Sequence, residues 1–264
     1  MELEELCKEV IELSKKVGAF IGGEQLKLKE EMIEVKSPNS LVTYVDKTAE
    51  RQIIEKLSEL LPESGFIAEE GTSDKTGKTF NWIIDPLDGT TNFIHGIPVY
   101  SVSIALQQRD EIVLGVVYEI NQAECFYAWK GSPAFLNGKK INVSKNDNFS
   151  DAMLATGFPY EDCSYMNGYF DLFQDLMGNC RSIRRLGSAA VDLAYVACGR
   201  FDAFYECSLN PWDVAAGALI VQQAGGTVSD FKDGNNYLNG GEIIASNRSI
   251  HAPLIEKVQK YCRS

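Results

Sequence analysis

The stretch Asp85-Pro86-Leu87-Asp88-Gly89-Thr90-Thr91-Asn92-Phe93 follows the apolar residues Trp82-Ile83-Ile84 and places two carboxylates three residues apart, where a strand is expected to end. Carboxylates in such a position can hold a hard cation, and a turn on the following glycine lets backbone N–H groups approach a phosphate. An ordinary strand that runs into an Asp-Pro turn is the alternative, because Asp, Pro and Gly are common turn formers. Taken alone, the stretch favours the turn.

Two further segments place acids at the ends of elements. Glu69 and Glu70 follow the short apolar run Gly65-Phe66-Ile67-Ala68, and Asp213 stands at the start of the helical pattern Trp212-Asp213-Val214-Ala215-Ala216-Gly217. Taken alone, Asp213 is better explained as a cap of the helix N-terminus, since Asp is among the best residues there, and a cap does not exclude a ligand role. Neighbouring side chains on a strand point to opposite faces, so Glu70 is more easily explained as a solvated acid than as a ligand. Three such acid-bearing ends are unlikely to coincide by chance.

The motifs at 85–93 and 212–217 resemble those of the inositol monophosphatase family, within the wider group of lithium-sensitive, magnesium-dependent phosphatases. The likeness runs from about residue 36 to residue 226. It implies a mixed α/β fold, a five-layered αβαβα sandwich with the metal site between two halves. We assign 1–142 to an N-terminal α+β half that carries Glu69, Asp85 and Asp88, and 143–264 to a C-terminal α/β half that carries Glu206 and Asp213. The polar, loop-like stretch 139–148 marks the expected boundary.

The resemblance also implies a metal centre with two or three Mg²⁺ ions per subunit. Glu69, Asp85 and the backbone carbonyl of Leu87 would bind one ion, and Asp85, Asp88 and Asp213 a second. Two such ions can activate water and stabilise a leaving oxygen. The implied catalytic residues are Glu69, Thr90 and Asp88, with Glu69 and Thr90 orienting a metal-activated water that attacks phosphorus directly.

The implied substrate site has a phosphate end and an alcohol end. Backbone N–H groups of Gly89, Thr90 and Thr91 should cradle the phosphate. Glu206 matches the family residue that accepts hydrogen bonds from inositol hydroxyls, although a solvated acid at a strand end remains the alternative. The same implied pocket also includes Asp213 and the segment Gly187-Ser188-Ala189.

The segment from Lys36 to Asp46 resembles the family's mobile segment at the mouth of the site. Lys36 would meet the phosphate, and Asp46 and Glu70 are candidates for a weak third ion or for outer contacts. An exposed lysine and a helix-capping Asp46 explain the same residues equally well.

Hydrophobic periodicity predicts the secondary structure. Predicted helices cover about the first twenty residues, 49–61, 169–177, 188–198, 213–224 and 252–261, and predicted strands cover 66–68, 99–106, 112–118, 124–129, 201–205 and 243–245. The strands between 99 and 129 follow one another with polar turns, which is typical of an antiparallel meander.

Charge and composition restrict the function classes. A net charge of −12 and a pI near 4.7 oppose nucleic-acid binding, which needs a basic surface. The acidic first residues and the absence of a long apolar run predict a cytoplasmic protein that does not enter membranes. Seven scattered cysteines argue for reduced thiols. We expect a small phosphate ester as the ligand and a homodimer as the assembly.

The leading function is hydrolysis of inositol monophosphate to inositol and phosphate. Relatives with the same metal core act on fructose 1,6-bisphosphate, phosphoadenosine phosphate or NADP, and these stay as alternatives; Thr91-Asn92-Phe93 favours the inositol branch over the nucleotide one. An inactive binding or regulatory homologue is a remote alternative. Against it, all of the implied core residues are present: Glu69, Asp85, Asp88, Thr90 and Asp213.

Overall fold

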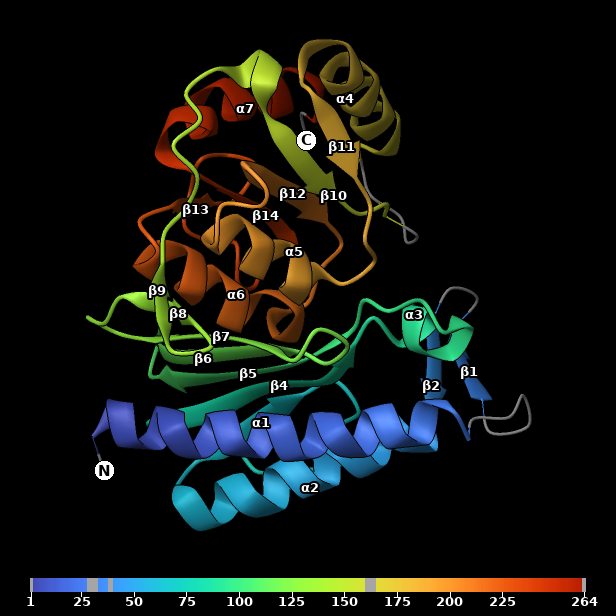
Figure 1. Ribbon diagram of the computed structural model, residues 1–264, viewed down its shortest axis with the longest axis vertical. Helices are drawn as coiled ribbons and strands as arrows, with labels where there is room; N and C mark the ends of the chain where they lie inside the picture. The colour runs from blue at the N-terminus through green and yellow to red at the C-terminus, as the bar shows by residue number, and fades with distance from the viewer. Residues whose placement is uncertain (1, 28–32, 38–39, 160–164, 263–264) are drawn as a thin grey trace.

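The computed structural model describes residues 2–27, 33–37, 40–159 and 165–262, with backbone alone for 33, 35–37 and 40–42. The chain forms five layers, αβαβα (Figure 1). Helices α1 and α2 cover one face of a larger sheet, α5 and α6 lie between the two sheets, and α4 and α7 cover the outer face of the smaller sheet. The helices are α1 (Leu3–Gln25), α2 (Tyr44–Leu60), α3 (Thr90–His95), η2 (Phe149–Asp151), α4 (Met166–Asn179), α5 (Ala189–Ala197), α6 (Pro211–Gln223) and α7 (Arg248–Tyr261).

The larger sheet has seven strands in the order β3-β4-β5-β6-β7-β8-β9. β3 runs parallel to β4, and all the other neighbours are antiparallel, so the predicted meander is confirmed. Its strands are β3 (Gly65–Ala68), β4 (Phe80–Asp88), β5 (Ser101–Gln108), β6 (Glu111–Glu119), β7 (Glu124–Trp129), β8 (Ala134–Leu136) and β9 (Lys139–Ile141).

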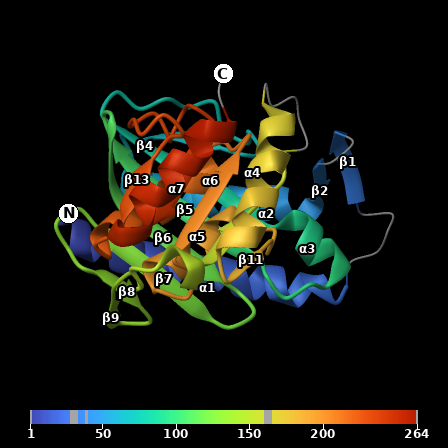
Figure 2. The same cartoon turned by 90° about the horizontal axis from the view of Figure 1, so that it is seen from above.

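The smaller sheet has five strands in the order β11-β10-β12-β14-β13. β10 pairs in parallel with both β11 and β12, and β14 runs antiparallel to β12 and β13. A separate hairpin, β1–β2, lies at one edge of the molecule beside α3 (Figure 2). These strands are β1 (Ile33–Ser37), β2 (Ser40–Thr43), β10 (Met153–Thr156), β11 (Ser182–Arg184), β12 (Ala203–Cys207), β13 (Thr227–Ser229) and β14 (Glu242–Ser246).

Apolar side chains fill the space between the layers in three clusters: one around the middle helices and the inner faces of both sheets, one between the larger sheet and α1 and α2, and one between the smaller sheet and α4 and α7. Two glycines allow close approaches in the middle layer. A Cβ on Gly217 of α6 would lie 2.5 Å from the Cβ of Leu193, and one on Gly115 of β6 would lie 2.7 Å from the carbonyl oxygen of Ala216. Glycine at these two positions lets α6 approach both α5 and the larger sheet.

One sequence expectation about this region is wrong. Residues 139–148 do not form a continuous loop, because Lys139–Ile141 is strand β9. Asn137 and Gly138 both have positive φ, 47° and 80°, as the two central residues of a tight hairpin turn require. The Asn-Gly pair was the available signal for this hairpin. The division into halves at 142/143 stays a prediction.

Within the described residues, no helix combines the length and the apolar character that a membrane span needs. Cys7, Cys125, Cys180 and Cys198 are free thiols, and Cys163 lies outside the described residues.

Candidate functional site

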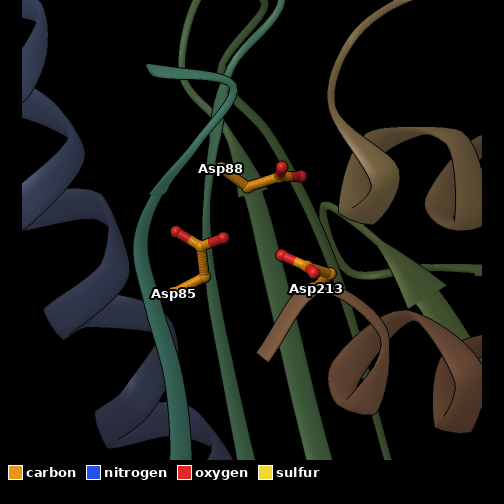
Figure 3. Close-up of side chains that lie close together, drawn as sticks. All are labelled: Asp85, Asp88 and Asp213. Carbon is orange, nitrogen blue, oxygen red and sulfur yellow. The ribbon is translucent and has the colours of Figure 1, made fainter. Parts of the chain in front are cut away.

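Three of the predicted ligands meet at one place. Asp85, Asp88 and Asp213 each offer a carboxylate oxygen, and these oxygens all lie within 4.8 Å of one another. Figure 3 shows the first two on the end of β4 and the third at the start of α6, with the three side chains around a common space. The larger sheet and the middle helix layer therefore both contribute to how this cluster is placed.

A bulge in β4 explains how two aspartates three residues apart reach the same space. In a regular strand, residues 85 and 88 would point to opposite faces of the sheet. Here Asp85 pairs with Ser103 and Asp88 with Ser101, so β4 has one more residue than β5 between these pairs. The extra residue returns Asp88 to the face of Asp85. The N–H of Leu87 donates to Asp85 Oδ1 at 2.9 Å and closes the turn at Pro86.

Asp88 is tied to the start of α5. Its Oδ2 accepts hydrogen bonds from the Ser188 hydroxyl at 2.6 Å and from the Ala190 N–H at 2.8 Å. Burial raises the pKa of Asp88 to about 6, and these donors oppose the rise. Ser188, predicted to line the alcohol pocket, thus contacts a predicted metal ligand.

Asp213 is the third residue of α6, and its Oδ2 accepts the N–H of Asn210 at 2.6 Å. The helix-capping interpretation is therefore confirmed, and the same side chain still joins the acidic cluster. Burial, followed by the charge of Asp88, raises its pKa well above the usual range.

Glu69 lies beside the cluster, after the end of β3. Its carboxyl is in hydrogen-bonding contact with Asp85. Burial raises the pKa of Asp85 well above its ordinary value, and Glu69, Asp88 and Asp213 add to the rise. Asp85 is only 2% exposed and Asp88 8%. Several carboxylates crowded in a buried place are costly as free anions, and an all-oxygen donor set suits a hard divalent cation such as Mg²⁺ or Ca²⁺.

Thr90 brings Asp46 into the site. Its hydroxyl lies 3.0 Å from both Asp46 Oδ1 and the Leu87 carbonyl oxygen, and it can donate to only one of them at a time. The other carboxylate oxygen of Asp46 accepts the N–H and the hydroxyl of Thr43, which is a capping box at the start of α2. Burial raises the pKa of Asp46, and these hydrogen bonds oppose the rise. The capping interpretation is confirmed, whereas the Thr90–Asp46 pair was missed because its members lie 44 residues apart.

The turn behind Asp88 requires glycine. Gly89 has φ of 95°, and a Cβ there would lie 3.0 Å from the Val99 carbonyl oxygen and 3.3 Å from that of Gly187. The predicted phosphate-binding residues Gly89, Thr90 and Thr91 are therefore next to the predicted segment 187–189. Thr91 is exposed.

The predicted alcohol pocket includes Glu206 on β12, and a second acid, Asp192 on α5, lies near it. Glu206 is partly buried, and burial raises its pKa to about 8 against the opposing charge of Arg185. Asp192 is 1% exposed, and its Oδ1 has no hydrogen-bond partner among the described residues. Burial raises the pKa of Asp192 well above its usual value, with further contributions from Glu206 and Asp88. Sequence reasoning missed Asp192, although it is the one acid in the otherwise apolar run of α5.

Two further predicted residues are Lys36 and Glu70. Lys36 belongs to β1, but its side chain lies outside the described part of the structure. Glu70 is partly buried, and its N–H donates to Glu50 at 2.8 Å. A ligand role for either residue stays a prediction.

Comparison with known proteins places the chain in a family. A model of the inositol monophosphatase family matches residues 2–263. The chain is 36% identical over 256 residues to inositol-1-monophosphatase of Mesorhizobium japonicum, covering 97% of this chain and 96% of that protein. It is 45% identical over 225 residues to Nus factor SuhB of Escherichia coli, covering 85% and 84%. The solved IMPase of Thermotoga maritima superposes with a TM-score of 0.86 at 37% identity, covering 96% of each chain. The chain therefore belongs to the inositol monophosphatase family.

Proposed function

We propose that the protein is a magnesium-dependent phosphomonoesterase that hydrolyses inositol monophosphate to inositol and phosphate. The observation that carries the proposal is the convergence of Asp85, Asp88 and Asp213 beside the Thr90–Asp46 pair. Similarity to proteins named inositol-1-monophosphatase supports the choice of substrate.

The residues that would hold the cations are Glu69, Asp85, Asp88, Asp213 and the carbonyl of Leu87. Charge neutralisation, a lowered pKa of water and stabilisation of the leaving oxygen are what divalent cations supply when bound. The protein's charge of −12 would otherwise repel a phosphate ester, so we expect cations to bind before or with the substrate.

Thr90 and Asp46 would guide the attacking water. When the Thr90 hydroxyl donates to Asp46 Oδ1, its oxygen lone pairs are left to accept a hydrogen bond from water. The proton of that water then has a path through the hydroxyl to the buried Asp46 carboxylate. Glu69, beside Asp85, would hold the same water from the other side.

The two ends of the substrate would meet different groups. The first N–H groups of a helix have no partner within it, so those of Gly89, Thr90 and Thr91, at the start of α3, would bind phosphate oxygens. The carboxylate of Glu206 would accept hydrogen bonds from the hydroxyls of the alcohol.

A second candidate is a regulatory role, which the relatives named Nus factor SuhB favour. Such a role does not by itself need an acidic cluster beside a Thr–Asp pair, so that cluster argues for catalysis.

Phosphate release from the purified protein tests the proposal. Inositol 1-phosphate, fructose 1,6-bisphosphate, phosphoadenosine phosphate and NADP would each be assayed with Mg²⁺ and with a chelator. We expect the highest kcat/KM for inositol 1-phosphate and no turnover in chelator. A higher kcat/KM for another ester would reassign the substrate, and no Mg²⁺-dependent release from any of them would leave the regulatory role.

A further inference from the structure

Glu50 is a buried acid on α2 that has no part in the mechanism above. Its side chain is fully buried, at 0% exposure, and each of its two oxygens accepts one backbone N–H. Oε2 accepts the N–H of Glu70 and Oε1 that of Thr72, both at 2.8 Å. Burying a carboxylate costs free energy unless hydrogen bonds compensate for the lost water. Among the described residues, these two backbone donors are what compensates for it.

The two donors belong to the turn that follows Glu69. β3 ends at Ala68, and the N–H of Glu69 makes the last contact with β4, at 3.2 Å from the Ile84 carbonyl oxygen. Gly71 then turns the chain with φ of 62°, and both Gly71 and Thr72 are exposed. The turn therefore depends on Glu50 for its attachment to the protein interior.

Glu50 and Asp46 are four residues apart on α2, and side chains at this spacing lie on the same face of a helix. Asp46 contacts Thr90, after β4, and Glu50 holds the turn after β3. One helix thus fixes two segments of the site that are distant from each other in the sequence.

We propose that Glu50 is a positioning residue that sets the backbone of 70–72 and, through it, directs Glu69 toward Asp85. This positioning of Glu69 should tighten the binding of divalent cations. The part of the proposal that concerns cations rests on the proposed function. Groups that orient metal ligands typically contribute about ten- to a hundredfold to metal affinity.

Glu50→Gln tests the proposal because it keeps the volume of the side chain but turns one acceptor into a donor that faces a backbone N–H. We expect amide hydrogen exchange at Glu70 and Thr72 to accelerate by about tenfold or more, and calorimetric Mg²⁺ binding to weaken by about ten- to a hundredfold. At saturating Mg²⁺, kcat should recover most of its value, which a general loss of structure would not allow. Glu55→Gln is the matched control, since it makes the same change at an exposed position of α2.

The proposal would be overturned if Glu50→Gln exchanged the amide hydrogens of Glu70 and Thr72 at the wild-type rate, or bound Mg²⁺ with unchanged affinity. If Glu50→Gln fails to fold, Glu50→Asp keeps the charge and withdraws both oxygens from the turn, and the same two measurements apply to it. Exchange and calorimetry need no turnover. A wild-type protein without phosphatase activity would therefore refute the proposed function and still leave the role of Glu50 open to this test.

Discussion

The acids of the predicted metal centre, here called the metal side, and those of the predicted alcohol pocket, here called the alcohol side, are held differently. On the metal side, each aspartate of the cluster accepts a hydrogen bond from a donor of the protein: Asp85 from Leu87, Asp88 from Ser188 and Ala190, and Asp213 from Asn210. On the alcohol side, within the part of the chain that the structure describes, Asp192 Oδ1 has no hydrogen-bond partner and Glu206 accepts no hydrogen bond.

We infer from this difference that the two groups of acids have different functions. Carboxylates whose direction is fixed in advance can meet a cation without reorganising, which is how preorganised sites gain affinity and rate. Glu206 is only partly buried and has no protein donor among the described residues, so it is left to bind a donor that enters, such as the hydroxyl of an alcohol. We therefore expect changes on the metal side to affect rate, and changes on the alcohol side to affect substrate choice.

The largest effect is expected for Asp85→Asn. Asp85 contacts Glu69 and belongs to the acidic cluster, so its loss should lower kcat by roughly a thousandfold, the upper end for a single electrostatic contact in an active site. The metal-free variant should melt at a higher temperature than the metal-free wild type, because one of several crowded carboxylates is removed. Steady-state kinetics and thermal unfolding measure both. Wild-type turnover at saturating Mg²⁺ would remove the distinction between the two sides.

The next largest effect is expected in how the stability of the metal-free protein depends on pH. The pKa of Glu206 is about 8 in the folded protein and 4.5 ordinarily, so the fold favours the protonated carboxyl. The resulting stability is fully present below about pH 4.5 and is lost as pH rises through about 8. Unfolding by urea in chelator measures this. Between pH 5 and 8.5, the free energy of unfolding should fall by a few kcal/mol less in Glu206→Gln than in the wild type. Exposed Glu256→Gln is the control, and a pH profile of Glu206→Gln that parallels the wild type would contradict the assignment.

Gly157→Ala should alter the alcohol side alone. A Cβ on Gly157 would lie 1.8 Å from Glu206 Oε1, so alanine must displace that carboxylate. We expect KM for inositol 1-phosphate to rise about tenfold, equivalent to about 1.4 kcal/mol, with kcat for p-nitrophenyl phosphate nearly unchanged. Gly178→Ala, where a Cβ meets nothing within 4 Å, is the matched control. An equal loss for both substrates would mean that Gly157 supports the fold rather than the pocket.

Local pattern was enough to predict many of the elements. The apolar residues of α1 recur every three or four positions, and Leu6, Val10, Leu13 and Val17 are all buried as this spacing requires. The strands of the meander and the helices α5 and α6 were predictable for a different reason: they are continuous apolar runs, because both of their sides are buried. Short strands such as β8 and β9 carry too few residues for a period to be recognised.

Only those site residues that belong to a recognisable sequence motif could be predicted. The cluster of Asp85, Asp88 and Asp213 agrees with the predicted ligand set, although the roles of its members stay predictions. The Thr90–Asp46 pair and the contact of Glu50 with the turn after β3 join residues 44 and 20 to 22 positions apart. Such pairs depend on how α2 packs against β4, which no local pattern encodes. The bulge that turns Asp88 toward Asp85 likewise depends on the register with β5.

The smallest effect is expected for Ser188→Ala, which tests whether a second donor is enough to hold a metal-side acid. The variant removes the hydroxyl that donates to Asp88 Oδ2 but leaves the N–H of Ala190 on the same oxygen. We expect kcat/KM to fall by about three- to tenfold, as loss of one hydrogen bond to a charged group while another remains implies. Stability should fall by about 1 kcal/mol because Ser188 also caps α5. Ser188→Thr keeps the hydroxyl and should restore activity. A loss as large as that of Asp85→Asn would mean that the backbone donor alone cannot orient Asp88, and that the metal side is less firmly fixed than its hydrogen bonds suggest.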